Sequence, residues 1–297
     1  MTDSTDRSTP TRIVDAHVHL WDPARTDWYP YLGGGRELGM GDVTGMARRF
    51  DPQTYRSEAG DWPVDKLVNV AAATGRHSIA ETIEFDRLAD ADADTDGQPA
   101  ALIGGLPATE STAEAISLID DQMAAARFRG VRPMNPKAPP APDGEVLAAL
   151  TERNLVCELM VHPPDLLEAA HRVAGHPDLT VVVEHTGWPR SADDGERALW
   201  LEGMKALADT GQNVCAKLSG LAMPLGAMTA DAFRPWLEPV IEMFGVDRCL
   251  FASNFPVDGL HGSLDQLWSA YAEVTAGLGV ADVQALYAGT AERVYRC

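Results

Sequence analysis

The stretch that decides the fold is Val14-Asp15-Ala16-His17-Val18-His19, near the start of a 297-residue chain, where an apolar strand pattern ends in two histidines. Seven further short apolar segments follow it, at 67–72, 101–106, 128–132, 155–161, 179–184, 212–218 and 248–253. Longer amphipathic stretches that fit helices lie between them. Alternating strand and helix patterns predict βαβ units, and eight strands in this length predict an α/β fold with a single (β/α)8 TIM barrel.

The first connection is unusually long. About fifty residues separate the first two strands, where most βα connections are far shorter, and they carry Trp21, Trp28, Tyr29, Tyr31 and Trp62. These aromatics form either a cap over a substrate, with Trp28 as a candidate contact, or a small hydrophobic core under the loop. Residues 1–10 are polar and predict a disordered tail, which leaves 11–297 as the barrel.

Composition narrows the partners. The chain has 44 Asp and Glu against 24 Lys and Arg, a formal net charge of -20, which disfavours nucleic acid and anionic membranes. Neither a membrane-spanning run nor a signal-peptide core is present, so we expect a soluble, cytoplasmic protein acting on a small molecule, with a homo-oligomer left open. The four cysteines show no CxxC spacing, and three lie in apolar runs that predict buried, reduced thiols.

Histidines end two of the predicted strands. His17 and His19 are two residues apart, so on a strand they point to one face and converge on one point. His185 ends the sixth strand in Glu184-His185-Thr186-Gly187. Because barrel active sites lie at the carboxyl ends of the strands, these histidines are candidate metal ligands, or acid and base groups when no metal is bound. The alternative is that they only form hydrogen bonds at strand ends.

The fifth strand carries a second candidate group. Glu158, Met160 and His162 share one face by the two-residue period. If that face points inward, the site gains Glu158 as a catalytic carboxylate and His162 as a substrate contact; if it points outward, the prediction fails. The inward orientation is favoured, because polar groups that face apolar helices would lack hydrogen-bond partners.

Cations also end two strands. Arg132 ends the fourth and Lys217 lies near the end of the seventh, and both suit an anionic group of the substrate. A structural ion pair is the alternative. Asn254 ends the eighth strand as a candidate catalytic residue, and Asp258 follows it as a candidate substrate contact.

These motifs together resemble the amidohydrolase-related TIM-barrel hydrolases, which include sugar-acid lactonases and 2-pyrone-4,6-dicarboxylate lactonase. The resemblance runs from residue 12 to residue 296 and implies that His17, His19 and His185 line the active site, holding a divalent metal such as zinc or manganese in some members. The family usually ends its eighth strand in Gly-Ser-Asp-Trp-Pro, whose Asp activates water, but here Asn254 stands in that place. An amide takes no proton near neutral pH and is a poorer metal ligand than a carboxylate.

The predicted activity is hydrolysis of a lactone or related cyclic ester by activated water. Without an Asp at position 254, the base is another carboxylate, with Glu158, Asp15 and Asp258 as candidates, or the reaction needs no such base. A non-oxidative decarboxylase or other carbon–carbon lyase is the alternative enzyme, and a non-catalytic ligand-binding barrel is the alternative outside enzymes.

Overall fold

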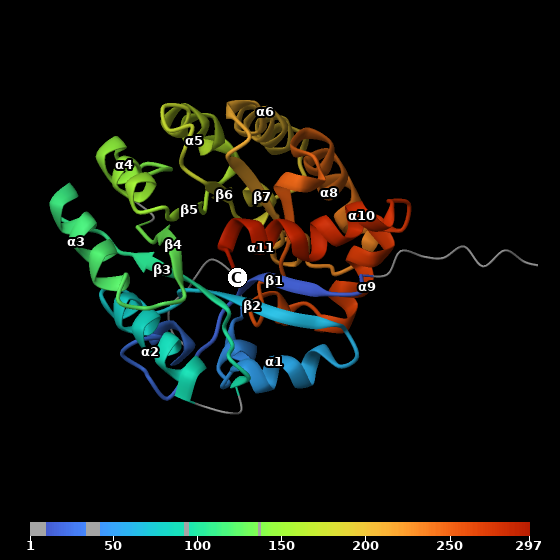
Figure 1. Cartoon of the computed structure of the whole chain (residues 1–297). Coiled ribbons are helices and arrows are strands. Elements are labelled where there is room, and N and C mark those ends of the chain that lie inside the picture. Colours follow the sequence, from blue (N-terminus) through green and yellow to red (C-terminus); the bar gives the residue numbers. More distant parts are fainter. Residues whose placement is uncertain (1–9, 34–41, 92–94, 136–137) are drawn as a thin grey trace, which may run out of the picture.

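The structure, a computed structural model, describes residues 10–33, 42–91, 95–135 and 138–297, so all of the predicted tail except Pro10 lies outside it. Eight parallel strands pair in chain order to form one sheet, and helices alternate with them around the ring (Figure 1). The predicted (β/α)8 barrel is confirmed. The strands are β1 (Ile13–Val18), β2 (Val64–Val70), β3 (Ala101–Leu106), β4 (Phe128–Pro133), β5 (Val156–Leu159), β6 (Val181–Val183), β7 (Val214–Leu218) and β8 (Cys249–Phe251).

The helices fall close to the amphipathic stretches of the sequence. They are α1 (Pro52–Ala59), α2 (His77–Ala91), α3 (Thr112–Gln122), α4 (Gly144–Glu152), α5 (Leu166–Val173), α6 (Asp194–Thr210), α7 (Ala222–Leu225), α8 (Ala230–Phe244), α9 (Leu264–Thr275), α10 (Val280–Gln284) and α11 (Thr290–Tyr295). At the end of the chain, α10 and α11 are joined by a π-helical turn at Ala285–Gly289.

The barrel closes where β1 meets the chain after β8. The amide of Asn254 donates to His17 O at 2.9 Å, and that of His19 to Phe255 O at 2.8 Å. Asp15 Oδ1 accepts from the amide of Ser253 at 2.8 Å and Oδ2 from Tyr55 Oη–H at 2.7 Å. Both oxygens of Asp15 are engaged in these contacts, and Asp15 is fully buried and does not line the pocket at the barrel mouth, which favours a structural role over that of catalytic base.

The long first connection contains a helix that the sequence analysis missed. Asp51 caps α1 by accepting from the Thr54 amide at 2.8 Å, and Pro52 occupies the first turn. An acidic cap followed by proline is a recognised helix start. The aromatic residues of this connection contribute to both a core and a pocket. Tyr29 is buried in the core, whereas Tyr31 lines a pocket at the barrel mouth.

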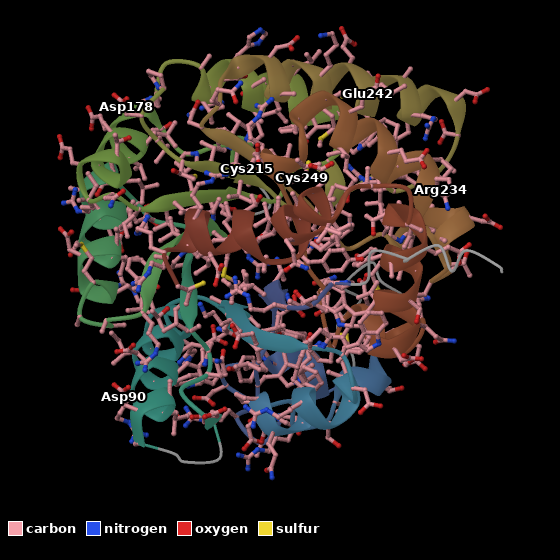
Figure 2. All side chains as sticks on the ribbon, turned by 45° about the vertical axis from the view of Figure 1, so that its right-hand side comes forward. Asp90, Asp178, Cys215, Arg234, Glu242 and Cys249 are labelled. Atoms are coloured by element: carbon pink, nitrogen blue, oxygen red, sulfur yellow. The ribbon has the colours of Figure 1, made fainter. Side chains whose placement is uncertain are left out.

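The interior of the barrel is packed with small and branched residues, including Val68, Ile103 and Val182, and Tyr295 of α11 joins this cluster. In Figure 1, α11 lies across the centre of the ring. The predicted buried thiols are confirmed for Cys157, Cys215 and Cys249, and Figure 2 shows the last two inside while labelled acidic and basic side chains lie at the periphery. No helix in the described part of the chain is long and apolar enough to cross a bilayer.

Candidate active site

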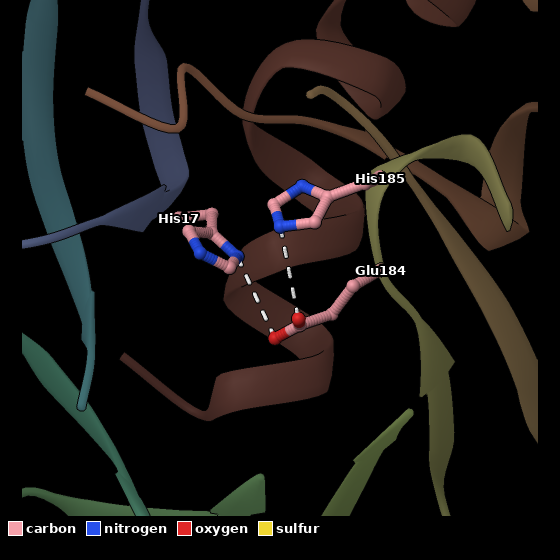
Figure 3. Close-up of side chains that lie close together, drawn as sticks. All are labelled: His17, Glu184 and His185. Carbon is pink, nitrogen blue, oxygen red and sulfur yellow. Dashed lines mark ion pairs between the residues drawn. The ribbon is translucent and has the colours of Figure 1, made fainter. Parts of the chain in front are cut away.

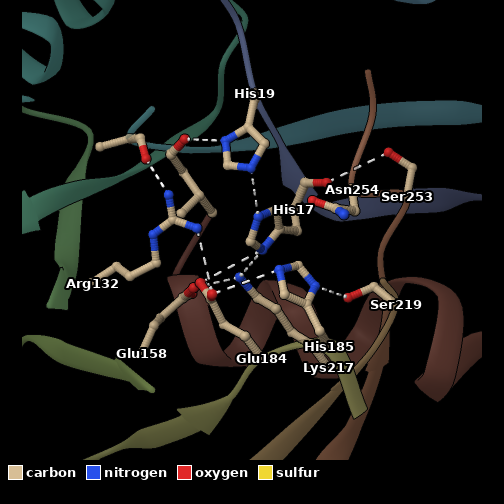
Figure 4. Close-up of polar contacts among 12 residues, drawn as sticks. His17, His19, Arg132, Glu158, Glu184, His185, Lys217, Ser219, Ser253 and Asn254 are labelled. Atoms are coloured by element: carbon tan, nitrogen blue, oxygen red, sulfur yellow. Dashed lines mark hydrogen bonds and ion pairs between the residues drawn. The ribbon is translucent and has the colours of Figure 1, made fainter. Parts of the chain in front are cut away.

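A chain of hydrogen bonds orders the two histidines at the end of β1, His17 within the strand and His19 just after it (Figure 4). Lys217 Nζ lies 3.3 Å from His17 Nδ1, His17 Nε2 lies 3.2 Å from His19 Nε2, and His19 Nδ1 lies 2.7 Å from the carbonyl of Val70. An ammonium only donates and a carbonyl only accepts, so the protons sit on His17 Nε2 and His19 Nδ1. His17 and His19 therefore converge, as their spacing predicted.

His185 reaches the same point from the end of β6. Its own φ is 52° and that of Thr186 is 57°, so the chain turns through the left-handed region directly after the strand. Gly220 has a φ of 69°, and a Cβ there would lie 2.6 Å from the imidazole, so glycine is required for the ring to fit. Ser219 Oγ holds His185 Nδ1 at 3.1 Å.

Glu184 is a site residue that the sequence analysis did not select. Its Oε1 lies 3.7 Å from His17 Nδ1 and its Oε2 lies 3.7 Å from His185 Nε2, so the carboxylate contacts both rings (Figure 3). Oε1 is buried and accepts no hydrogen bond from the described residues. The sequence position of Glu184 could have predicted this, because it is a carboxylate at the end of a buried strand and directly precedes the candidate ligand His185.

Glu158 points into the barrel, as favoured, but its oxygens are already engaged. Oε2 accepts from Lys217 Nζ and Oε1 from Tyr295 Oη, both at 2.6 Å. Burial raises the pKa of the Glu158 carboxyl, and the Lys217 ammonium opposes that shift. Glu158 and Lys217 are fully buried and absent from the pocket wall. The structure thus places both as an ion pair beneath the histidines, the alternative left open for Lys217.

Arg132 approaches from β4. Its Nη1 lies 3.5 Å from Glu184 Oε2, and its Nη2 donates to the carbonyl of Ala71. Burial lowers the pKa of His17, His19 and His185 well below the ordinary value, and nearby Lys217 and Arg132 lower it further. All three imidazoles are therefore neutral near pH 7, the form that binds metals and accepts protons.

A pocket of about 280 Å³ opens above this cluster. Its polar lining includes His19, Arg132, His185 and Asn254, which come from four different strand ends. Asn254 Nδ2 donates to Asp258 Oδ1 at 2.8 Å, so the amide oxygen of Asn254 remains as an acceptor.

Three predicted substrate contacts lie elsewhere. Asp258 is fully buried behind Asn254. Burial raises the pKa of the Asp258 carboxyl to about 7, although the hydrogen bond from Asn254 opposes that shift. His162 Nδ1 is 3.0 Å from the carbonyl of Trp188, where it supports a pocket wall. Trp28 lines a second cavity and stacks on His77 at 5.9 Å. Trp28 is not among the residues that line the pocket beside His19 and His185.

The donor set fits one divalent ion. His17, His185 and Glu184 each bring a ligand atom to within 4.8 Å of the others, and all three are buried. Neutral imidazoles and a carboxylate with an unpartnered oxygen are ligands that zinc and manganese accept. His19 lies beside them through its contact with His17.

Comparison with known proteins relates the chain to one family. The amidohydrolase family matches residues 14–297. The uncharacterized protein y4mH of Sinorhizobium fredii is 31% identical over 300 residues, covering 96% of this chain and 98% of that protein. An L-fucono-1,5-lactonase of Burkholderia ambifaria is 28% identical over 282 residues, covering 88% and 86%.

Solved structures share the fold. The crystal structure of an amidohydrolase from Burkholderia multivorans with bound zinc has a TM-score of 0.74 and 23% identity, covering 96% of this chain and 99% of that one. Since the family match spans nearly the whole barrel and includes every strand end described above, the chain belongs to the amidohydrolase family.

Proposed function

We propose that this amidohydrolase is a lactonase that opens the ring of a small lactone or cyclic ester bearing a carboxylate. The observation that carries the proposal is Glu184, a buried carboxylate with a free oxygen that contacts two neutral histidines, one of which, His185, lines a pocket of substrate size. The relative named L-fucono-1,5-lactonase supports the same reaction class.

The side chains divide the work of hydrolysis. Water in the pocket donates one hydrogen bond to the amide oxygen of Asn254 and transfers its other proton to the carboxylate of Glu184, which is fully buried behind His185 of the pocket lining. Its oxygen attacks the lactone carbonyl, the ring C–O bond breaks, and Glu184 returns the proton to the leaving alkoxide. Free N–H groups of Arg132 bind the substrate carboxylate, and its Nη1 also contacts Glu184 Oε2 at 3.5 Å.

A divalent metal would be held by His17, His185 and Glu184, with His19 adjacent. When bound, zinc or manganese supplies Lewis-acid polarisation and lowers the pKa of water. The proton acceptor named above remains available, because a carboxylate that binds an ion through one oxygen keeps the other.

The test is Glu184→Gln, assayed on a lactone panel by following acid release. We expect kcat/KM to fall at least about 100-fold, whereas Glu202→Gln, at an exposed position on α6, leaves it unchanged. Near-normal turnover in folded Glu184→Gln would remove Glu184 from the mechanism. If the protein opens the ring of no lactone on the panel but releases carbon dioxide from aromatic acids, the proposed activity is replaced by decarboxylation.

Metal dependence is measured separately. Purified protein is analysed for bound metal and assayed before and after chelation, then after zinc or manganese is restored. Loss and recovery of activity supports the metal site, and full activity without stoichiometric metal refutes it.

A further inference from the structure

The walls of the pocket differ in character from its floor. The floor is polar, with His19, Arg132, His185 and Asn254. The walls are thioether, indole and aliphatic groups, supplied by Trp21, Met46, Met160, Trp188, Met223 and Val257. Among the described residues that line the pocket, Arg132 alone carries a charge.

Several polar atoms of the lining are already used within the protein. Tyr31 Oη–H donates to the carbonyl of Ala72 at 2.9 Å, and Trp21 Nε1–H donates to that of Arg48 at 3.0 Å. The Asn254 amide group donates to Asp258. Among the described lining residues, the acceptors and donors left for a substrate are therefore concentrated in His19, Arg132, His185 and Asn254 at the floor.

We infer that the substrate is a lactone with an apolar body, alkyl or aromatic, rather than a polyhydroxylated sugar lactone. Each ring hydroxyl of a sugar lactone would leave water for a thioether or aromatic wall without a matching partner, which disfavours binding. Methionines suit an apolar body because their flexible, polarisable side chains adapt to its shape. The inference rests on the proposed lactonase activity and runs against the substrate printed in the name of the lactonase relative.

A matched pair of lactones tests the inference. L-fucono-1,5-lactone has three ring hydroxyls, and 6-methyloxan-2-one is the same ring and methyl group without them. Each kcat/KM is divided by the rate constant for hydroxide hydrolysis of the same lactone, because hydroxyls activate the ring. We expect the deoxygenated lactone to be favoured by about 100-fold or more. Equal values, or a preference for the hydroxylated lactone, would overturn the inference.

Binding of the ring-opened products needs no turnover and separates the two proposals. In calorimetry, 5-hydroxyhexanoate should bind at least about tenfold more tightly than L-fuconate. If no lactone is hydrolysed, the lactonase proposal fails, while this order of affinities still decides the character of the pocket. Equal affinities, the reverse order, or binding of neither acid refutes the apolar-substrate inference.

Substitutions in the wall provide a further check. Met160 and Met223 line the pocket, and Met160 is 38% exposed, so Met160→Gln and Met223→Gln place hydrogen-bonding groups there with little change in volume. Each should reduce the ratio of the two corrected kcat/KM values about tenfold. Met123→Gln, at an exposed position after α3, is the matched control. An unchanged ratio in both wall variants, or an equal change in the control, would refute the assignment.

Discussion

Restoring a carboxylate at position 254 alone should not restore a catalytic base. Asn254 Nδ2 is 2.8 Å from Asp258 Oδ1, and both residues are buried. In Asn254→Asp an oxygen replaces that nitrogen, so two carboxylates face each other at about the same distance. With an effective dielectric constant of about 20, two negative charges there repel by about 6 kcal/mol, equivalent to about four pK units.

The two acids would therefore share one proton near neutral pH, as closely paired carboxylates do. Exchanging the residues, in Asn254→Asp with Asp258→Asn, keeps one negative charge and one amide and reverses the direction of the hydrogen bond. A free carboxylate then faces the pocket. A positioned general base contributes about 10²- to 10⁴-fold, so the exchange should raise kcat/KM by about 100-fold, and the single variant by less than about tenfold.

The assay is the pH profile of kcat/KM for the best lactone of the panel, with wild type and Asp258→Asn as controls. The single variant should gain activity only at alkaline pH, because mutual repulsion raises the pKa at which the second proton leaves. The exchange should be active from mildly acidic pH upward. Equal gains and equal profiles for the single variant and the exchange would refute the reasoning, since they would show that Asp258 does not hold a proton against position 254.

Three further outcomes follow from buried polar groups. Glu158→Gln should lower the free energy of unfolding by about 3 kcal/mol, since it leaves the Lys217 ammonium without its carboxylate. The kcat of the folded fraction should stay within about tenfold of the wild-type value. Unchanged stability together with abolished turnover would contradict this assignment. Tyr55→Phe removes one donor from buried Asp15 and should cost about 1–3 kcal/mol in chemical denaturation, and a neutral effect contradicts the proposed closure. The raised pKa of Asp258, about 7, gives stability that is complete below about pH 4 and is lost as pH rises through about 7, by roughly 4 kcal/mol. Asp258→Asn should flatten that part of the stability profile, and an unchanged slope would refute it.

The barrel was predictable because its signals are local. Eight apolar segments at barrel spacing predict the strands, and the period of two predicts that His17 and His19 converge, as they do at 3.2 Å. Helix α1 was also accessible, since Asp51 and Pro52 form a start signal. The aromatic residues of that connection favoured a cap or a small core, and neither interpretation requires a helix.

The partners of the site residues were not predictable in the same way. The two-residue period shows that Glu158 can point inward, but only the packed barrel shows that Tyr295, 137 residues away in sequence, occupies one of its oxygens. Glu184 acquires its role from rings contributed by β1 and by its own turn. Which carboxylate has a free oxygen depends on contacts between distant strands, and no local pattern encodes them.

His17 contacts both the buried Lys217 ammonium and the Glu184 carboxylate. Its Nδ1 accepts from Lys217 Nζ at 3.3 Å, and Glu158 holds that ammonium in place. A metal held by His17 would compete with the Lys217 ammonium for the lone pair of this imidazole. The ion pair of Lys217 with Glu158, which also accepts from Tyr295 of the last helix, would therefore influence the affinity of the site for a metal.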